Sequence, residues 1–373
     1  MRTVLLAGGG TGGHIYPNIA VAERLAQLAP DVGIHFLVSD RAGDERILAT
    51  HGGTHTAVPV RPLPRPTEPW RIPGFLTTWR QSVKTVRGLL RTAGVGAVVA
   101  TGGFVSGPAV TAARRLSVPT ALVNLDAVPG IANRYLSRRT DEMFTTYDSP
   151  RLPGAQQIGL PLRASSTSRL TASDARQRLG LEPDRPTLFI TGATHGAQSM
   201  IEAVQALVAH RPVRAALAGW QVLHQCGTYD ATRLQADYDA AGVAALVVDY
   251  LDEMGIAWAA SDLAIARAGA GTVSEAWANA TPTVFLPNPH HPDQRLGRNA
   301  RPLVDAGGAL LVDDQLDASR TAETLAEGLL PLLADDARRK GMREALTRTC
   351  PTPGADVIAN WVVDRLRPPA APT

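Results

Sequence analysis

Short apolar runs alternate with segments of helical spacing through the first half of the chain. Residues 4–7, 34–38, 95–100 and 120–123 predict buried strands, whereas residues 19–26 place their apolar side chains on one face of a helix. Strands that alternate with helices predict a parallel sheet covered by helices on both faces. The first half is therefore expected to be a doubly wound α/β domain.

The same pattern restarts in the second half. Residues 187–191, 244–248 and 263–266 predict strands, and a helix is expected from about residue 199 to residue 209. A chain of 373 residues is long enough for two cores. We expect a first domain over residues 1–160, a second over 161–345, and a closing segment, 346–373, whose helix returns to the first domain.

Residues 59–74 hold six prolines and predict an exposed loop. From residue 70 onward, aromatic and basic residues interleave, which suits the headgroup region of an anionic membrane. Partial burial in the core explains the apolar members equally well. The candidate membrane patch consists of Trp70, Ile72, Phe75, Leu76, Trp79, Arg80, Lys84 and Arg87.

Composition narrows the function classes. With 45% hydrophobic and 19% charged residues the chain is typical of globular proteins, and a net charge of +3 is too small to indicate nucleic acid. No apolar run approaches the roughly 18 residues of a membrane span, and the N-terminus lacks a signal-peptide pattern, so we expect a cytoplasmic protein. Cys226 and Cys350 lack CxxC spacing, which argues against a zinc site.

Three glycine-rich turns follow predicted strands, at residues 8–14, 101–107 and 269–275. Glycine lets the backbone turn tightly and approach a ligand, and the helix that follows points its N–H groups at negative charge. Such turns in both halves predict that phosphates or sugars bind between two α/β domains, and they indicate an enzyme.

The first turn also fits a dinucleotide-binding pattern. Gly8, Gly10 and Gly13 match G-x-G-x-x-G, and Asp40 is available as the acidic residue after the second strand. The turn continues through residues 12–14, where the helix of a dinucleotide site should already have begun. This argument disfavours a nicotinamide or flavin cofactor.

His14 is the most specific single candidate for a catalytic residue. It lies at the carboxyl edge of a predicted parallel sheet, where such folds bind ligands. The positive end of the following helix would favour its neutral form, which can accept a proton. The alternative is a histidine that caps the helix or faces solvent.

Glu275 has two interpretations as well. Thr272 and Glu275 fit the capping box S/T-x-x-E, which the local pattern favours, but the carboxylate could also accept two hydrogen bonds from a sugar diol. The turn at residues 192–197 would present backbone N–H groups and the Thr194 hydroxyl to a diphosphate, or simply join a strand to a helix. Arg163 could neutralise phosphate, or be solvated.

Together, residues 9–17, 102–108 and 267–275 resemble the signature turns of the MurG family of N-acetylglucosaminyltransferases. The resemblance covers essentially the whole chain. It implies a GT-B fold, two Rossmann-like domains with the active site between them. It also implies transfer of N-acetylglucosamine from UDP-GlcNAc to undecaprenyl-linked lipid I, with inversion and without a cofactor or catalytic metal, at the cytoplasmic face of the plasma membrane.

The resemblance assigns roles to individual residues. His14 would activate the acceptor C4 hydroxyl, Glu275 would bind the ribose, and the backbone of Leu251 would read the uracil edge. The implied donor-binding residues are Thr11, Gly12, Gly13, Arg163, Thr194, Leu251, Gly271, Thr272, Glu275 and Gln294. The implied acceptor-diphosphate residues are Gly10, Gly102, Gly103 and Ser106.

The chain departs from the family pattern at three places. Asn124 and Asp126 replace the expected Glu and Asn, so Asp126 becomes a second candidate for proton abstraction. Arg295-Leu296 stands where glutamine is expected, and Gln294 could serve through a shifted loop; Leu160 replaces asparagine before Pro161. Another GT-B transferase with a different acceptor, and a non-catalytic UDP-sugar-binding protein, therefore stay open.

Overall fold

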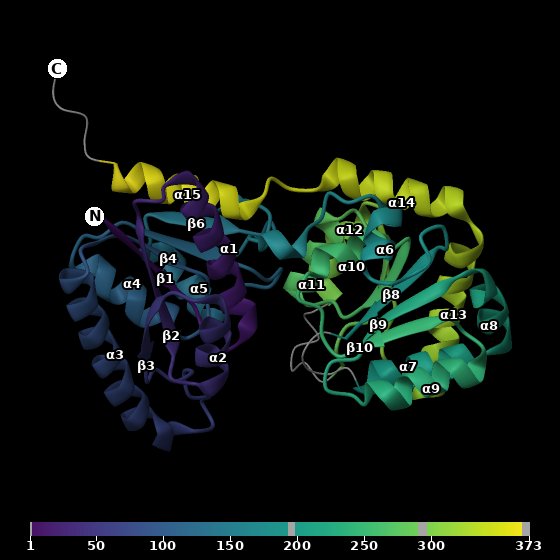
Figure 1. Ribbon diagram of the computed structural model, residues 1–373. Coiled ribbons are helices and arrows are strands. Elements are labelled where there is room, and N and C mark those ends of the chain that lie inside the picture. Colours follow the sequence, from purple (N-terminus) through teal and green to yellow (C-terminus); the bar gives the residue numbers. More distant parts are fainter. Residues whose placement is uncertain (1, 193–197, 290–296, 368–373) are drawn as a thin grey trace. The chain divides into compact units, whose positions relative to one another are not determined.

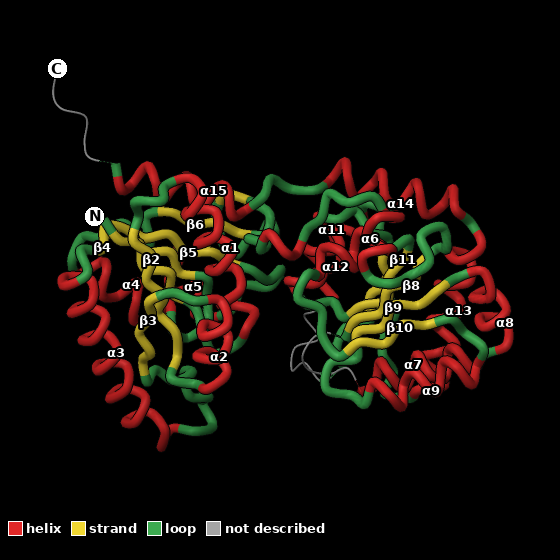
Figure 2. Tube along the Cα trace, viewed as in Figure 1, coloured by secondary structure: helices red, strands yellow, loops and turns green. Residues whose placement is uncertain are grey.

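The computed structural model describes residues 2–192, 198–289 and 297–367. Contacts divide the chain into two compact units, which are described separately (Figure 1). Unit 1 holds residues 1–163 and 351–373, and unit 2 holds residues 164–350. Each unit contains one sheet flanked by helices (Figure 2).

The sheet of unit 1 has seven strands in the order β3-β2-β1-β4-β5-β6-β7, and every pair is parallel. The strand order reverses between β1 and β4, which makes this a topological switch point, where open α/β sheets bind ligands. The strands are β1 (Thr3–Ala7), β2 (Gly33–Ser39), β3 (Thr54–Val58), β4 (Val95–Ala100), β5 (Thr120–Asn124), β6 (Glu142–Thr145) and β7 (Gln156–Gln157).

Helices cover the sheet of unit 1. α3 and α4 contribute to one apolar core, and α15 packs against α1 and β4, where Arg24 pairs with Asp356. The helices are α1 (Gly12–Leu28), α2 (Ala42–His51), η1 (Pro69–Arg71), α3 (Ile72–Thr92), α4 (Ser106–Arg115), α5 (Ile131–Leu136), η2 (Ser137–Arg139) and α15 (Gly354–Leu366).

The proline-rich segment ends earlier than the sequence predicted. η1 begins at Pro69 and α3 at Ile72, so the loop expected over residues 59–74 is too long. Pro73 lies in the first turn of α3. Proline is tolerated there because the first N–H groups of a helix have no intrahelical acceptor.

Unit 2 repeats the architecture with six parallel strands in the order β10-β9-β8-β11-β12-β13. Its switch point lies between β8 and β11, so the chain segments that follow these two strands begin there. The expected α/β fold is confirmed. The strands are β8 (Thr187–Thr191), β9 (Gln221–Gln225), β10 (Ala245–Val248), β11 (Leu263–Ala266), β12 (Thr283–Phe285) and β13 (Ala309–Leu311).

The helices of unit 2 enclose two apolar cores, one on each side of the sheet. They are η3 (Ala164–Ser166), α6 (Ala172–Arg178), α7 (Gln198–Ala209), α8 (Arg211–Ala216), η4 (Leu217–Gly219), α9 (Ala231–Ala241), α10 (Met254–Ala260), α11 (Ala270–Ala278), α12 (Gly297–Asp305), α13 (Ala318–Ala334) and α14 (Asp336–Thr349).

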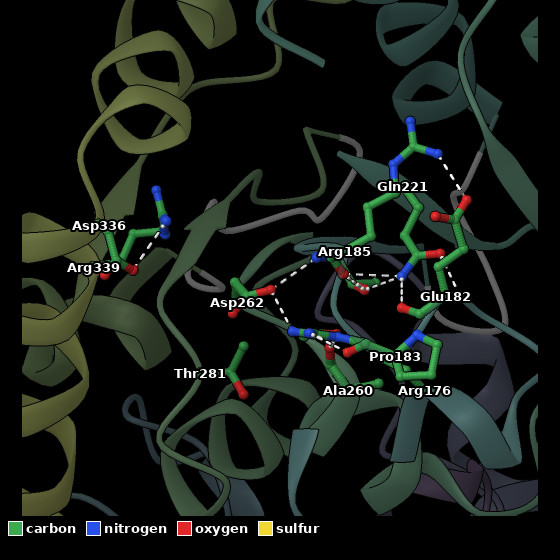
Figure 3. A network of polar contacts seen from close by, with 12 residues as sticks. Arg176, Glu182, Pro183, Arg185, Gln221, Ala260, Asp262, Thr281, Asp336 and Arg339 are labelled. Atoms are coloured by element: carbon green, nitrogen blue, oxygen red, sulfur yellow. Dashed lines mark hydrogen bonds and ion pairs between the residues drawn. The ribbon is translucent and has the colours of Figure 1, made fainter. Parts of the chain in front are cut away.

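A polar network fixes the amino ends of β8 and β11, opposite the carboxyl ends that carry the turns (Figure 3). Arg176 of α6 donates to Asp262 at 2.6 Å and to the carbonyl oxygens of Ala260 and Pro183 at 2.9 Å. The same carboxylate accepts the Thr187 N–H at 2.7 Å. Because the buried guanidinium is paired and hydrogen-bonded, α6 is held firmly to the sheet.

Candidate active site

The first glycine turn joins β1 to α1 at the switch point of unit 1. Gly10 has φ of +93°, and a Cβ there would lie 2.3 Å from a Phe104 ring carbon, so the position requires glycine. α1 begins at Gly12, with Thr11 as an N-cap that makes no side-chain capping bond. Residues 12–14 are thus helical, and the argument that they delay the helix was wrong.

Asp40, considered as the acidic residue of a dinucleotide site, is engaged with a neighbouring cation. Its carboxylate accepts two hydrogen bonds from Arg61, one of them from Nη2 at 2.9 Å. The hydrogen bond from Arg61 lowers the pKa of Asp40. The ion pair with Arg61 therefore explains the role of the Asp40 carboxylate without a bound ribose.

The His14 ring lies against the second glycine turn. His14 Nδ1 is 2.9 Å from the Thr101 carbonyl oxygen. Because a carbonyl only accepts, Nδ1 carries the proton and the neutral imidazole keeps its lone pair on Nε2. A Cβ at Gly102 or Gly103 would come within 3.2 Å of the ring, and both glycines have positive φ. The ring is therefore oriented by this turn, and the interpretation of His14 as a helix cap was wrong.

A buried carboxylate that no sequence motif pointed to holds the first turn. Asp44 of α2 is 2% exposed, and its Oδ2 accepts the Gly10 N–H at 2.7 Å. The same oxygen accepts the Ser39 N–H at 3.1 Å and the Ser39 hydroxyl at 2.6 Å. Asp44 thereby ties the end of β2 to the glycine turn.

Asn124, one of the departures from the family pattern, is a structural residue in this chain. It is buried at the end of β5, and its Nδ2 donates to the Asp126 carbonyl oxygen at 2.7 Å and to Thr145 Oγ1 at 3.1 Å. Its Oδ1 accepts from Asn133 Nδ2 at 3.0 Å. Asp126 is exposed on the loop that follows, with its backbone held by Asn124.

The remaining acceptor-side candidate, Ser106, begins α4. Its hydroxyl is buried and donates to the Gly102 carbonyl oxygen at 2.6 Å. Ser106 therefore stabilises the positive-φ conformation of the second turn, next to the His14 ring. The N-terminus of α4, like that of α1, begins at this switch point.

Arg163, a donor-side candidate, contacts two residues that sequence reasoning missed. Its Nη1 lies 3.0 Å from His51 Nε2, and its guanidinium lies 4.5 Å from the centroid of the Tyr16 ring. All three residues belong to unit 1.

In unit 2 the capping-box interpretation of Glu275 was wrong. α11 begins at Ala270 with Gly269 as its N-cap, so Thr272 lies inside the helix. The Glu275 carboxylate accepts Ser166 Oγ at 3.0 Å and Trp258 Nε1 at 3.2 Å. These two side chains orient the half-buried carboxylate.

An ion pair lies under the third glycine turn. Arg267 and Asp314 are 4% and 1% exposed in their side chains and lie 2.8 Å apart, and Ser199 Oγ is within 2.8 Å of both. Burial lowers the pKa of Arg267, while hydrogen bonds from Ser199 and Arg267 outweigh burial and lower the pKa of Asp314. The pair joins the segments that follow β11 and β13, and Ser199 connects it to the start of α7.

The other donor-side candidates differ in what the structure describes. Leu251 follows β10 and packs its side chain on the core, which leaves its backbone at the carboxyl edge of the sheet. Gly271 is exposed, and no described residue comes within 4 Å of a Cβ placed there. Thr194 and Gln294 lie outside the described residues.

The candidate membrane patch divides between surface and core. Trp70 is 72% exposed, and Ile72 and Leu76 are also exposed. Phe75 is half-buried, and Trp79 packs on the core of unit 1. Arg80 and Lys84 are exposed, whereas Arg87 is half-buried. Among the described residues, no helix combines the length and apolar character that crossing a bilayer requires.

Comparisons with known proteins agree with this architecture. The glycosyltransferase family 28 N-terminal domain matches residues 4–145, and the family 28 C-terminal domain matches residues 187–351. The structure is similar to the crystal structure of Acinetobacter baumannii MurG, with a TM-score of 0.76 and 22% identity over 97% of this chain and 99% of that one. This likeness supports the GT-B fold.

Two curated relatives carry the same name, UDP-N-acetylglucosamine–N-acetylmuramyl-(pentapeptide) pyrophosphoryl-undecaprenol N-acetylglucosamine transferase. The Nocardioides relative is 36% identical over 97% of both chains. The Streptomyces coelicolor relative is 36% identical over 97% of this chain and 98% of its own. This chain therefore belongs to glycosyltransferase family 28 and, within it, to the MurG family of N-acetylglucosamine transferases.

Proposed function

We propose that this protein transfers N-acetylglucosamine from UDP-GlcNAc to the C4 hydroxyl of undecaprenyl-diphosphate-MurNAc-pentapeptide, lipid I, and so forms lipid II. The observation that carries the proposal is the orientation of His14 at the switch point of unit 1. Its Nδ1–H is committed to Thr101, which directs the lone pair of Nε2 away from that carbonyl. The membership of the chain in the MurG family supplies the substrates.

His14 acts as the general base in this mechanism. Nε2 takes the proton of the acceptor C4 hydroxyl while that oxygen attacks the anomeric carbon from the face opposite UDP. The bond between the anomeric carbon and the diphosphate oxygen breaks, and UDP leaves with the electron pair. The Thr101 carbonyl stabilises the imidazolium that forms, because it accepts the Nδ1–H in both states.

The acceptor diphosphate binds at the two glycine turns of unit 1. Gly10, Gly102 and Gly103 have positive φ and present backbone without side chains, while Ser106 holds the second turn. The N-termini of α1 and α4 meet at the same switch point, and helix N-termini favour phosphate.

The donor binds to unit 2 through Glu275, Leu251 and the N-terminal end of α11, which contains Gly271. A carboxylate has about four lone-pair sites, so Glu275 can accept the ribose hydroxyls in addition to Ser166 and Trp258. Thr272, Thr194 and Gln294 complete the donor side in unit 2. The family resemblance also assigns Thr11, Gly12, Gly13 and Arg163 to the donor. No metal is required, because Arg163 and helix N-termini stabilise the departing diphosphate.

The protein works at the cytoplasmic face of the plasma membrane as a peripheral protein. Ile72 and Leu76 of α3, together with Trp70 just before it, provide exposed apolar surface. Arg80 and Lys84 are exposed on the same helix. Apolar side chains surrounded by cations suit an anionic lipid surface. This location brings the site to an acceptor that is anchored in the bilayer.

The test is incubation of the purified protein with UDP-GlcNAc and a soluble lipid I analogue in the presence of a chelator. UDP release and a disaccharide product of the expected mass support the proposal. Absence of product, with UDP-GlcNAc still raising the melting temperature, would favour a different acceptor or a UDP-sugar-binding protein without activity. Activity that requires added metal would contradict the metal-free mechanism alone.

A further inference from the structure

In unit 1, one residue of α1 and one residue of α2 contact the guanidinium of Arg163. Arg163 Nη1 donates to His51 Nε2 at 3.0 Å, and its guanidinium stacks on the ring of Tyr16, 4.5 Å from the centroid. His51 is the last residue of α2, and Tyr16 lies at the start of the second turn of α1. Tyr16 lies within the first signature turn, residues 9–17, and His51 lies outside the three turns; sequence reasoning assigned a role to neither.

Each partner of Arg163 is itself held in place. His51 Nδ1 lies 2.9 Å from the Ile47 carbonyl oxygen, so Nδ1 carries the proton and Nε2 offers its lone pair to Arg163. The rings of Tyr16 and His51 meet edge to face, with centroids 5.8 Å apart. A Cβ at Gly12 would lie 3.1 Å from Tyr16 Cε2, so the Tyr16 ring also touches the first turn of α1.

This arrangement places the positive charge of Arg163 near the N-terminus of α1, which by itself would repel a cation. The N-terminus of α1 carries the positive end of the helix dipole, so a guanidinium near it needs compensation. The Tyr16 ring supplies cation–π attraction, and His51 supplies an acceptor. An anion at the same turn is attracted by both the helix end and the guanidinium.

We propose that Tyr16 and His51 are positioning residues that hold the Arg163 guanidinium beside the N-terminal turn of α1, ready to neutralise a substrate diphosphate. The inference rests on the proposed function, since the diphosphate is that of the UDP-sugar donor. It assigns the two residues no contact with the substrate. Their effect on catalysis passes through Arg163.

Calorimetric titration of the full chain with UDP tests this coupling. Tyr16→Leu, His51→Ala and Arg163→Ala should each weaken UDP binding by about threefold to tenfold. In the Arg163→Ala background the other two substitutions should cause no further loss, because non-additivity marks residues that act through one another. Tyr16→Phe and His51→Gln, which keep the ring and an acceptor, should retain most of the affinity.

His55→Ala is the matched control, since His55 is an exposed histidine of the same unit in β3. It should leave UDP affinity unchanged. Losses from Tyr16→Leu and His51→Ala that persist in full without Arg163 would overturn the proposal. Equal losses of melting temperature and affinity in every variant, His55→Ala included, would also overturn it.

A readout without ligand separates this inference from the proposed function. The ¹⁵N signal of the Arg163 guanidinium should show hindered rotation in the wild type and free rotation in Tyr16→Leu and His51→Ala. If the wild type does not bind UDP, the proposed function fails, while hindered rotation would still support the held guanidinium. Free rotation in the wild type would refute the held guanidinium even if UDP binds.

Discussion

Asp44 Oδ2 lies 2.7 Å from the Gly10 amide nitrogen, and this contact joins a buried carboxylate to the turn that precedes His14. The same oxygen accepts two hydrogen bonds from Ser39. One side chain thus fixes the backbone on which the proposed base depends, although it lies in a helix with no recognisable motif.

We predict that Asp44→Ala destabilises the protein by about 2 kcal/mol or more, because it leaves the Gly10 N–H and the Ser39 hydroxyl without their buried acceptor. Urea unfolding measures the change, and turnover should fall with it. Asp31→Ala, at an exposed aspartate of the same unit, is the control. Equal stability of the two variants would show that Asp44 does not hold the turn.

His14→Ala is expected to lower turnover by about two to four powers of ten, because it removes the general base. The melting temperature should change little, since the ring is only half-buried. Steady-state assays of UDP release with the lipid I analogue provide the measurement. Near-normal turnover, combined with a large loss in Asp126→Asn, would transfer the role to Asp126.

Glu275→Gln should raise the KM for UDP-GlcNAc about tenfold, because a neutral amide accepts more weakly from ribose hydroxyls than a carboxylate does. The substitution keeps an oxygen that can accept from Trp258 or Ser166, so the fold should stay stable. Donor-dependent kinetics and a melting curve check both parts. A lower melting temperature with unchanged KM would mean that Glu275 is structural.

Much of the fold was readable because local pattern and tertiary environment agree. The apolar run at residues 187–191 is strand β8, and the strands near residues 95–100 and 263–266 also lie where predicted. Glycine-rich turns follow β1 and β4 because backbone positions there have positive φ and lie too close to neighbouring residues to accommodate a Cβ. The turn that holds His14 was predicted to lie at the carboxyl edge of a parallel sheet, and the structure places it there, at the switch point between β1 and β4.

The predictions fail where the local sequence pattern does not show which partners a residue has in the folded chain. β9 was not predicted, since Gln221 and His224 break its apolar pattern, yet Gln221 is satisfied by Glu182, Arg185 and Thr187. The capping-box spacing at Thr272 was misleading because Gly269 is the N-cap of α11, so Thr272 is already the third residue of the helix.

His224 makes stability depend on pH. Burial lowers its pKa to about 3, from 6.5 in an unfolded chain, so between these values the unfolded state binds a proton that the folded state refuses. Its contribution to stability is therefore lost as pH falls from 6.5 toward 3, by up to about 1.4 kcal/mol per pH unit. Urea unfolding at several pH values measures the effect. As the pH falls, the free energy of unfolding should decrease less steeply in His224→Gln than in the wild type.

The same series on His210→Gln provides the control for His224. His210 is an exposed histidine of unit 2, so its replacement should leave the pH slope close to that of the wild type. Identical slopes in all three proteins would mean that His224 is protonated in the folded state, against its burial beside Tyr238.

Membrane association should depend on the exposed members of the patch. Trp70 and Leu76 expose apolar surface that gains free energy in the headgroup region, so the double variant Trp70→Ala/Leu76→Ser should bind vesicles of anionic lipid about tenfold more weakly. Salt should weaken binding of the wild type, because Arg80 and Lys84 contribute electrostatically. Leu316→Ser, at an exposed leucine of unit 2, is the matched control for vesicle sedimentation. If the control loses as much binding as the double variant, or if the double variant sediments like the wild type, the patch does not contact the membrane and the acceptor must be reached by another surface.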